Sequence, residues 1–180
     1  ATDVSDQLQL NLSGIETPYL WVANTGSNQI AQISTEDGRV IRTANVGGND
    51  PSRTAVDVNF NCWVGFRNGD AVGRFDNDWA SPEDRYFPNS FYSGSGLGEA
   101  WDRPRAVAIN ADGNVWIGNW DNTNMILLAP DTGAVLNTYE TPIRTWVSAD
   151  GTGEASRPHQ GGGQAYGFSL DAFGNLWAAQ

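Results

Sequence analysis

The stretch "NADGNVWIGNW", Asn110 to Trp120, decides the fold class. It places Asp-Gly-Asn between two short apolar runs, which predicts a β-hairpin because a tight type I′ turn needs the positive φ angles that Gly and Asn tolerate. A near copy returns as "LDAFGNLWAAQ" at 170–180. A less regular copy, "VDVNFNCWVGF" at 56–66, has the link between its runs shortened to "NFN". The hairpin is therefore a repeated unit.

Each repeat has a tryptophan in its second strand. These residues are Trp21, Trp63, Trp116 and Trp177, which stand 42, 53 and 61 residues apart. After Trp21 and after Trp116, two further apolar runs follow, separated by a turn that ends in Gly. They lie at 29–34 and 39–46, and at 125–130 and 134–140. Repeats of this length, built from four antiparallel strands without helical periodicity, predict an all-β fold, the β-propeller.

The number of blades follows from the same count. Residues 17–180 supply three blades and the first two strands of a fourth, while residues 1–16 form an N-terminal segment in which "QLQLNL" offers an extra strand. An open ring leaves an unpaired strand edge, so we expect either a remainder of a longer chain or further subunits to close it. A β-sandwich of unrelated hairpins is the alternative, and it does not explain why one hairpin recurs in register.

The inner strand of a blade is covered on both faces and stays small near the axis. "RAVAIN" fits this, with Val107 and Ile109 on one side and Ala106 and Ala108 on the other. The single cysteine, Cys62, lies in a predicted strand and is interpreted as a small buried apolar residue.

Composition excludes several partners. The 180-residue chain has a net charge of −11 and contains no Lys, so nucleic-acid backbones and anionic membrane surfaces would repel it. No apolar run approaches the roughly 20 residues that cross a bilayer. The chain begins "ATDVSD", which fits cleavage after a small-residue signal site. With its Asn, Gly and Trp content, this favours an extracellular or periplasmic location.

Two segments resemble known propeller repeats. "DPSRTAVDVNFNCWVGFRNGDAVGRFD" at 50–76 and "RPRAVAINADGNVWIGNW" at 103–120 are similar to bacterial NHL-like and streptogramin-lyase-like (virginiamycin B lyase-like) repeats, and the likeness extends from Thr17 onward. The resemblance implies a six- or seven-bladed ring, often secreted and often part of a larger surface protein. It also implies that lyase and lactonase relatives use His or carboxylates with a divalent metal at the channel mouth.

The loops entering the inner strands are expected to line that mouth. They bring Arg53, Arg105 and His159 to the starts of three inner strands. Two Arg and a His that converge there predict a site for a carboxylate or phosphate, which guanidinium binds bidentately. In the alternative interpretation, the arginines pair with Asp50 and Asp102 and lock the loops.

A catalytic hypothesis rests on His159, the only histidine. With Asp150 and Glu154 it would form a metal site, and Ca²⁺ or Mg²⁺ would be the cofactor. The spacing is irregular, since 11 residues separate Arg105 from Trp116 whereas the glycine-rich loop after His159 lengthens the corresponding interval to Trp177. The loops at 150–154 and 93–99 are otherwise interpreted as surface connections between blades.

Aromatic residues offer another route to function. The segment 76–94 contains Trp79, Tyr86, Phe91 and Tyr92, whose large rigid faces suit contacts with carbohydrate or protein. Alternatively these rings fill the gap between the second and third blades. Taken together, the sequence predicts a secreted or cell-surface propeller that acts as a binding or assembly module. A metal-dependent lyase-like or lactonase-like enzyme and a structural subunit of a surface layer or filament remain alternatives.

Overall fold

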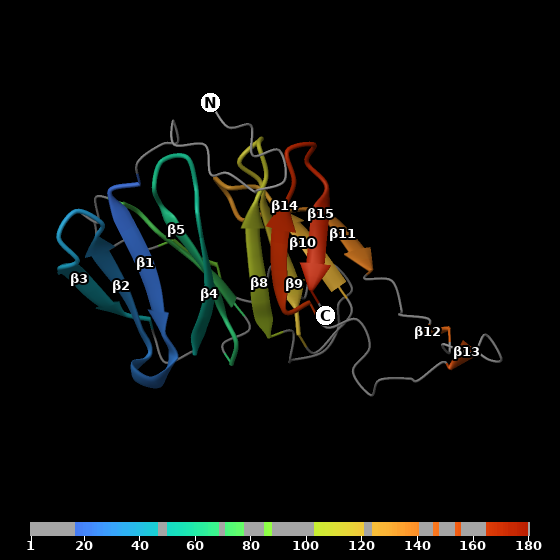
Figure 1. Ribbon diagram of the computed structural model, residues 1–180, viewed down its shortest axis with the longest axis horizontal. Helices are drawn as coiled ribbons and strands as arrows, with labels where there is room; N and C mark the ends of the chain where they lie inside the picture. Colours follow the sequence, from blue (N-terminus) through green and yellow to red (C-terminus); the bar gives the residue numbers. More distant parts are fainter. Residues whose placement is uncertain are drawn as a thin grey trace, which may run out of the picture.

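A computed structural model gives the chain as an all-β molecule (Figure 1). It describes residues 17–46, 50–68, 71–77, 85–87, 103–120, 124–140, 146–147, 154–155 and 165–179. Within these ranges every regular element is a β-strand except the 3-10 turn η1 (Thr25–Ser27). None of the described residues belongs to a helix long and apolar enough to span a membrane. The N-terminal segment 1–16 lies outside the described residues.

Four sheets follow one another along the chain, and we number them blades 1 to 4. Blade 1 consists of β1 (Tyr19–Asn24), β2 (Gln29–Ser34) and β3 (Val40–Asn45). Blade 2 consists of β4 (Pro51–Val56), β5 (Cys62–Phe66), β6 (Ala71–Phe75) and β7 (Arg85–Phe87). Blade 3 consists of β8 (Pro104–Ile109), β9 (Val115–Asn119), β10 (Asn124–Leu128) and β11 (Val135–Glu140). Blade 4 consists of β14 (Gly167–Leu170) and β15 (Leu176–Ala179).

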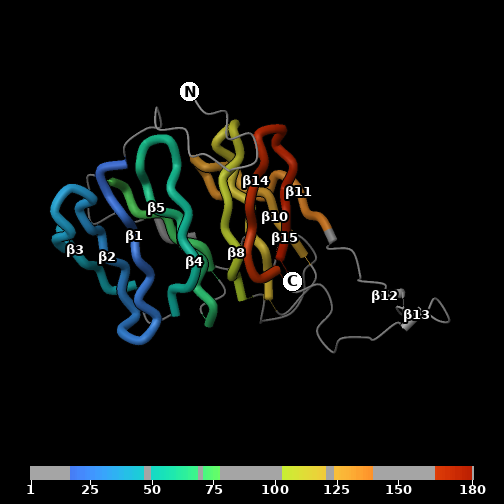
Figure 2. Tube along the Cα trace, in the orientation of Figure 1, coloured from blue at the N-terminus to red at the C-terminus, as the bar shows by residue number. Residues whose placement is uncertain are grey.

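This architecture confirms the predicted partial propeller. The strands within each blade pair antiparallel and in sequence order. The blades stand side by side, and β4 contacts β8, which contacts β14, so these three are the inner strands (Figures 1 and 2). One short hairpin was not predicted: β12 (Trp146–Val147) pairs with β13 (Glu154–Ala155) between blades 3 and 4 in sequence.

The inner hairpin turns, residues 57–61, 110–114 and 171–175, share one hydrogen-bond pattern. In each, the first side chain accepts the backbone N–H groups two and four residues later, and the fourth residue donates its N–H to the first carbonyl. Only the fourth residue has a positive φ among these turns, at Phe60, Gly113 and Gly174. The predicted type I′ turn, which needs two such residues, is therefore wrong. The loop is the three-residue type with a bulged fourth position.

The same pattern corrects the expected shortening of the second copy. Asp57 is as far from Trp63 as Asp171 is from Trp177, and Phe60 takes the left-handed position that Gly fills elsewhere, with φ of 64°. The second carboxylate oxygen of Asp57 accepts the Trp63 indole N–H at 3.3 Å, and that of Asp171 accepts the Trp177 indole at 3.1 Å. The repeated Asp, Asn and Trp are thus one bonded unit.

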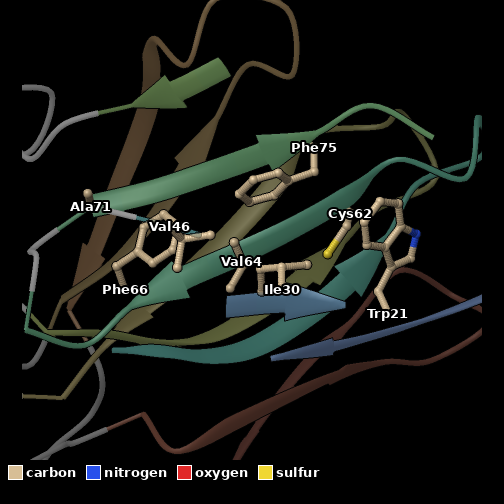
Figure 3. Packing of buried hydrophobic residues seen from close by; sticks show 8 residues of the cluster. All are labelled: Trp21, Ile30, Val46, Cys62, Val64, Phe66, Ala71 and Phe75. Carbon is tan, nitrogen blue, oxygen red and sulfur yellow. The ribbon is translucent and has the colours of Figure 1, made fainter. Parts of the chain in front are cut away.

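Packing between blades uses the same tryptophans. Trp21 lies in a buried cluster that joins blade 1 to blade 2, with Ile30, Cys62 and Val64 among its members (Figure 3). Trp63 lies in a second cluster, which joins blade 2 to blade 3. The prediction for Cys62 is confirmed: it is fully buried, and burial, with the Asp57 charge, raises the pKa of its thiol far above the usual range.

One further prediction concerns the inner strand of blade 3. Val107 and Ile109 both pack on the second cluster, as their alternation predicted. In blades 2 and 3, the glycine two residues after the tryptophan leaves room for the start of the inner strand of the following blade. A Cβ at Gly65 would lie 2.7 Å from the Pro104 carbonyl oxygen, and one at Gly118 would lie 2.5 Å from the Ala165 Cβ.

Candidate functional site

Both predicted mouth arginines lie near β-bulges at the starts of their inner strands. Between Pro51 and Thr54 the register of β4 on β5 shifts by one residue, and the register of β8 on β9 shifts in the same way around Arg105. An extra residue in one strand bends it and redirects the local side chains. The Pro-led starts of β4 and β8 therefore set the directions of Arg53 and Arg105.

The two arginines do not occupy equivalent positions: Arg105 directly follows Pro104, whereas Arg53 stands two residues after Pro51. Counting back five residues from the first residue of the inner hairpin turn gives Ser52, Arg105 and Tyr166 in blades 2, 3 and 4. Arg53 is one residue further along its strand. Three blades thus place different side chains at one end of the ring, and Tyr166 occupies the position that Arg105 fills in the preceding blade.

These side chains converge. The Arg53 guanidinium carbon lies 4.6 Å from the centre of the Tyr166 ring, and that of Arg105 lies 4.4 Å from the same ring. Arg105 also lies 4.6 Å from the Trp120 ring, which meets the Tyr166 ring edge to face at 5.5 Å. We name Arg53, Arg105, Trp120 and Tyr166 the mouth cluster. Its arginines and Trp120 are half-buried, and Tyr166 is exposed.

The guanidinium groups of Arg53 and Arg105 concentrate positive charge in the mouth cluster. The pKa of the Tyr166 phenol is lowered, chiefly by the charge of Arg53 and next by that of Arg105. Asp50, which the alternative interpretation paired with Arg53, instead forms an ion pair with Arg67 at 3.8 Å and accepts a hydrogen bond from Asn68. Asp102, the partner that the alternative interpretation gives to Arg105, lies outside the described residues. Within the described part of the chain, no carboxylate pairs with either mouth arginine.

A buried amide lies beside the mouth cluster. Asn119 stands opposite Pro104 at the end of β9, and its side chain is fully buried. Among the described residues, neither its oxygen nor its nitrogen has a hydrogen-bond partner, and the same is true of the Arg105 Nε. Buried polar atoms cost roughly 1–3 kcal/mol each when nothing satisfies them, so these groups are candidates for a contact with a bound ligand or water.

The remaining predicted site residues are not placed by the structure. Trp79, Phe91, Tyr92, Asp150 and His159 lie outside the described residues. Tyr86 and Glu154 contribute backbone to β7 and β13. Among the residues that are described, no three His, Cys, Asp or Glu side chains form a group that could hold a metal ion.

Sequence reasoning missed Trp120, Tyr166 and Asn119. Alignment on the proline drew attention to Arg53 and Arg105. Alignment on the first residue of each hairpin turn would have shown that Tyr166 of blade 4 occupies the position that Arg105 occupies in blade 3. Trp120 directly follows β9, where a loop side chain can reach the start of the neighbouring inner strand.

Comparison with known proteins supports the fold and leaves the chemistry open. No protein-family model matches the chain, and no characterised protein matches it by sequence. Solved structures do match. An inactive virginiamycin B lyase from Staphylococcus aureus, crystallised with quinupristin, has a TM-score of 0.65 at 14% identity over 89% of this chain. A WD40 β-propeller domain has a TM-score of 0.60 at 11% identity over 88%.

A chain of a mitotic checkpoint complex is also similar, with a TM-score of 0.59 at 12% identity over 88% of this chain. The matched parts cover 44%, 42% and 40% of these three structures, so the chain spans less than half the length of each. The likeness to streptogramin-lyase-like propellers that the sequence predicted is confirmed at the level of the fold. Identities this low carry no information about activity.

Proposed function

We propose that this chain is part of a binding propeller whose mouth cluster holds an anionic group of a ligand. The observation that carries the proposal is the convergence of two guanidiniums, from blades 2 and 3, on one tyrosine of blade 4. No carboxylate among the described residues neutralises them. Two arginines with no acidic partner among the described residues would form a site for a carboxylate or phosphate, which a guanidinium fork matches in geometry and charge.

The surrounding charge gives this site selectivity. The chain carries a net charge of −11, so most of its surface repels anions while the mouth cluster attracts them locally. The exposed ring of Tyr166 and the half-buried ring of Trp120 offer flat apolar contact next to the charge. The ligand class that fits is a protein or carbohydrate that presents a carboxylate or phosphate. Interblade loops, including the aromatic segment 76–94, would add contacts around it.

The proposal includes an extracellular or periplasmic setting. It is supported by composition, namely the absence of Lys and the abundance of Gly and Trp. Fractionation of cells that express the native gene, followed by immunoblotting, tests this part of the proposal. Recovery of the protein in the cytosolic fraction would contradict it.

The experiment for the mouth is a titration with inorganic phosphate and with acetate, followed by NMR. We expect saturable shifts of the Trp120 indole N–H and of the Arg105 Nε–H, because both groups border the anion. Arg53→Gln and Arg105→Gln should weaken the apparent affinity by roughly tenfold or more. Arg39→Gln is the matched control, since Arg39 lies on the surface and pairs with Asp37. Shifts that follow sodium chloride equally would refute a specific site.

The enzyme alternative has its own test. If His159, Asp150 and Glu154 hold a divalent cation, metal analysis of the purified chain should find it in stoichiometric amount, and His159→Ala should abolish it. Metal that disappears in this variant would favour catalysis over binding, whatever the phosphate titration shows.

A further inference from the structure

Tyr166, which directly precedes β14, is met by side chains from the inner strands of two other blades. Arg53 comes from blade 2 and Arg105 from blade 3, and their guanidinium carbons lie 4.6 and 4.4 Å from the centre of the tyrosine ring. Positive charge at such distances favours the phenolate over the phenol. The pKa of Tyr166 is lowered accordingly, chiefly by the charge of Arg53, next by that of Arg105, and then by a hydrogen bond from the Arg53 side chain. The two arginines of the proposed anion site therefore also activate a tyrosine oxygen beside it.

The backbone fixes the position of this phenol. The N–H of Tyr166 donates to the Ala179 carbonyl at 2.8 Å and extends the pairing of β14 with β15. The preceding residue, Ala165, is fully buried and donates its N–H to the Asn119 carbonyl of blade 3 at 3.3 Å. Trp120 meets the tyrosine ring edge to face at 5.5 Å. The side chain is thus anchored at the start of a strand and packed from the preceding blade, as a reacting group needs to be.

A second tyrosine of this chain has the same exposure and a different setting. Tyr139 of β11 is 40% exposed, and so is Tyr166. The Tyr139 hydroxyl accepts a hydrogen bond from the Asn137 amide at 2.8 Å, and its ring lies 5.1 Å from that of Trp116. Among the described residues, no arginine stacks on Tyr139. Exposure therefore does not distinguish the two phenols, and a difference in their reactivity reports the two guanidiniums.

We propose that Tyr166 is a nucleophile that accepts an acyl group from a donor whose leaving group, a phosphate or carboxylate, is held by Arg53 and Arg105. This inference rests on the anion site of the proposed function. A guanidinium has five N–H donors, so each arginine can contact the phenolic oxygen and still bind an oxygen of the leaving group. The carbonyl carbon of the donor then lies next to the nucleophile, which reduces the entropic cost of their encounter.

The step balances without a further reactant, as an acyl phosphate illustrates. The phenol proton passes to solvent, and the phenolate oxygen attacks the carbonyl carbon. An Oη–C bond forms while the C–O bond to phosphate breaks, and inorganic phosphate leaves with the electron pair of that bond. The two guanidiniums stabilise the charge that develops on the leaving phosphate. The product is an O-acyl tyrosine, and no atom is oxidised or reduced.

The test treats the whole chain with acetyl phosphate and locates the acetyl groups by peptide mass spectrometry. The chain contains no Lys, a residue that such reagents also acetylate, so the tyrosine products are read without that background. We expect Tyr166 to be acetylated roughly tenfold faster than Tyr139 or more. Arg53→Gln should bring the rate at Tyr166 close to that at Tyr139. Arg39→Gln is the matched control and should leave both rates unchanged, because Arg39 pairs with Asp37 on the surface.

A neutral donor shows whether the leaving group is held. N-acetylimidazole carries no phosphate, so its preference for Tyr166 over Tyr139 should be smaller than that of acetyl phosphate. Equal preferences would overturn the proposal, as would equal rates at the two tyrosines. Phosphotyrosine at Tyr166 would place the attack at phosphorus and overturn the acyl assignment. These comparisons use the wild-type chain, so they hold even where circular dichroism shows that Arg53→Gln does not fold.

The phosphate titration separates this inference from the proposed function. If phosphate binds at the mouth cluster and Tyr166 gains no acetyl group ahead of Tyr139, the anion site stands and the nucleophile does not. If phosphate does not bind there, both fail, because no leaving group is then held next to the phenol.

Discussion

The two ends of the inner strands differ in how closely the blades repeat one another. At the inner hairpin turns, Asp57 and Asp171 accept the same set of backbone and indole donors, and Asn110 accepts the same backbone donors. At the other end, the position of Arg105 is Ser52 in blade 2 and Tyr166 in blade 4. The turn end of the inner strands, which repeats from blade to blade, builds the ring. The other end, which varies, can specify a contact with a ligand.

The same contrast holds for polar satisfaction. The carboxylates of the inner hairpin turns accept hydrogen bonds from donors two, four and six residues further along the chain. Next to the mouth cluster, the buried Asn119 amide and the Arg105 Nε have no hydrogen-bond partner in the part of the chain that the structure describes. Gln32 Oε1 near the turn of blade 2 also lacks a partner among the described residues, but the charged turn carboxylates are satisfied, whereas the polar groups beside the mouth cluster are open to a ligand or to water. Substitutions at the two ends should therefore change the free energy of unfolding in opposite directions.

The largest effect is expected from Trp63→Ala. The indole is fully buried between blades 2 and 3 and is bonded to Asp57, so its loss should cost about 3–5 kcal/mol of unfolding free energy. Urea denaturation followed by circular dichroism measures it. Phe173→Ala is the control on an exposed turn and should change stability by about 0.5 kcal/mol or less. A small effect at Trp63 would mean that the turn end does not hold the blades together.

Asn119→Leu should have the opposite sign. The substitution replaces an unsatisfied buried amide by an apolar side chain of similar size, and blade 2 already has Phe66 at the corresponding position. Removing the penalty should stabilise the protein by roughly 1–3 kcal/mol. The same urea experiment reports it. Destabilisation by Asn119→Leu would show that the amide is satisfied in solution, and the contrast between the two ends would lose its energetic basis.

Sequence reasoning recovered the repeated part of this contrast and missed the variable part. The Asp, Asn and Trp of the hairpin are local and periodic, so the blades could be predicted from Trp21, Trp63, Trp116 and Trp177 alone. Even there, the turn type was wrong, because one left-handed residue suffices and Phe60 can supply it. Tyr166 meets Arg53 across more than a hundred residues. That contact depends on the ring geometry and on the bulges in β4 and β8, which the residue pattern does not reveal.

Acid should weaken the turn of blade 4. The side-chain hydrogen bond from Asn175, helped by backbone donors and the Trp177 indole, lowers the pKa of Asp171 to about 2 from its ordinary 3.8. A lowered folded pKa means that the carboxylate stabilises the fold above the ordinary value, and that this contribution is lost as the pH falls from about 4 toward 2. Asp171→Asn should remove that part of the pH dependence, since Asn110 serves the same turn in blade 3.

Thermal unfolding of both proteins between pH 2 and pH 5 provides the measurement, and the difference between the two curves isolates Asp171 from the other carboxylates. Asp37→Asn, in an exposed turn of blade 1, is the control. If the two curves stay parallel through this range, the bonds to Asp171 contribute nothing to stability, and the repeated turn would be a geometric feature only.

The smallest effect concerns the Tyr166 phenol and reports directly on the mouth cluster. Positive charge stabilises the phenolate, so Arg53 and Arg105 lower the pKa of Tyr166. An ultraviolet or NMR titration should show Tyr166 ionising below the ordinary pKa of a tyrosine. Arg53→Gln should raise that pKa most and Arg105→Gln less, while Arg39→Gln should leave it unchanged.

An anion bound between the two guanidiniums would neutralise them and raise the pKa of Tyr166 as well, so phosphate should reproduce the effect of the variants in the wild-type protein. If phosphate leaves the titration of Tyr166 unchanged, Arg53 and Arg105 hold the blades together and do not bind a ligand. Both ends of the inner strands would then have a structural role, although their sequences differ.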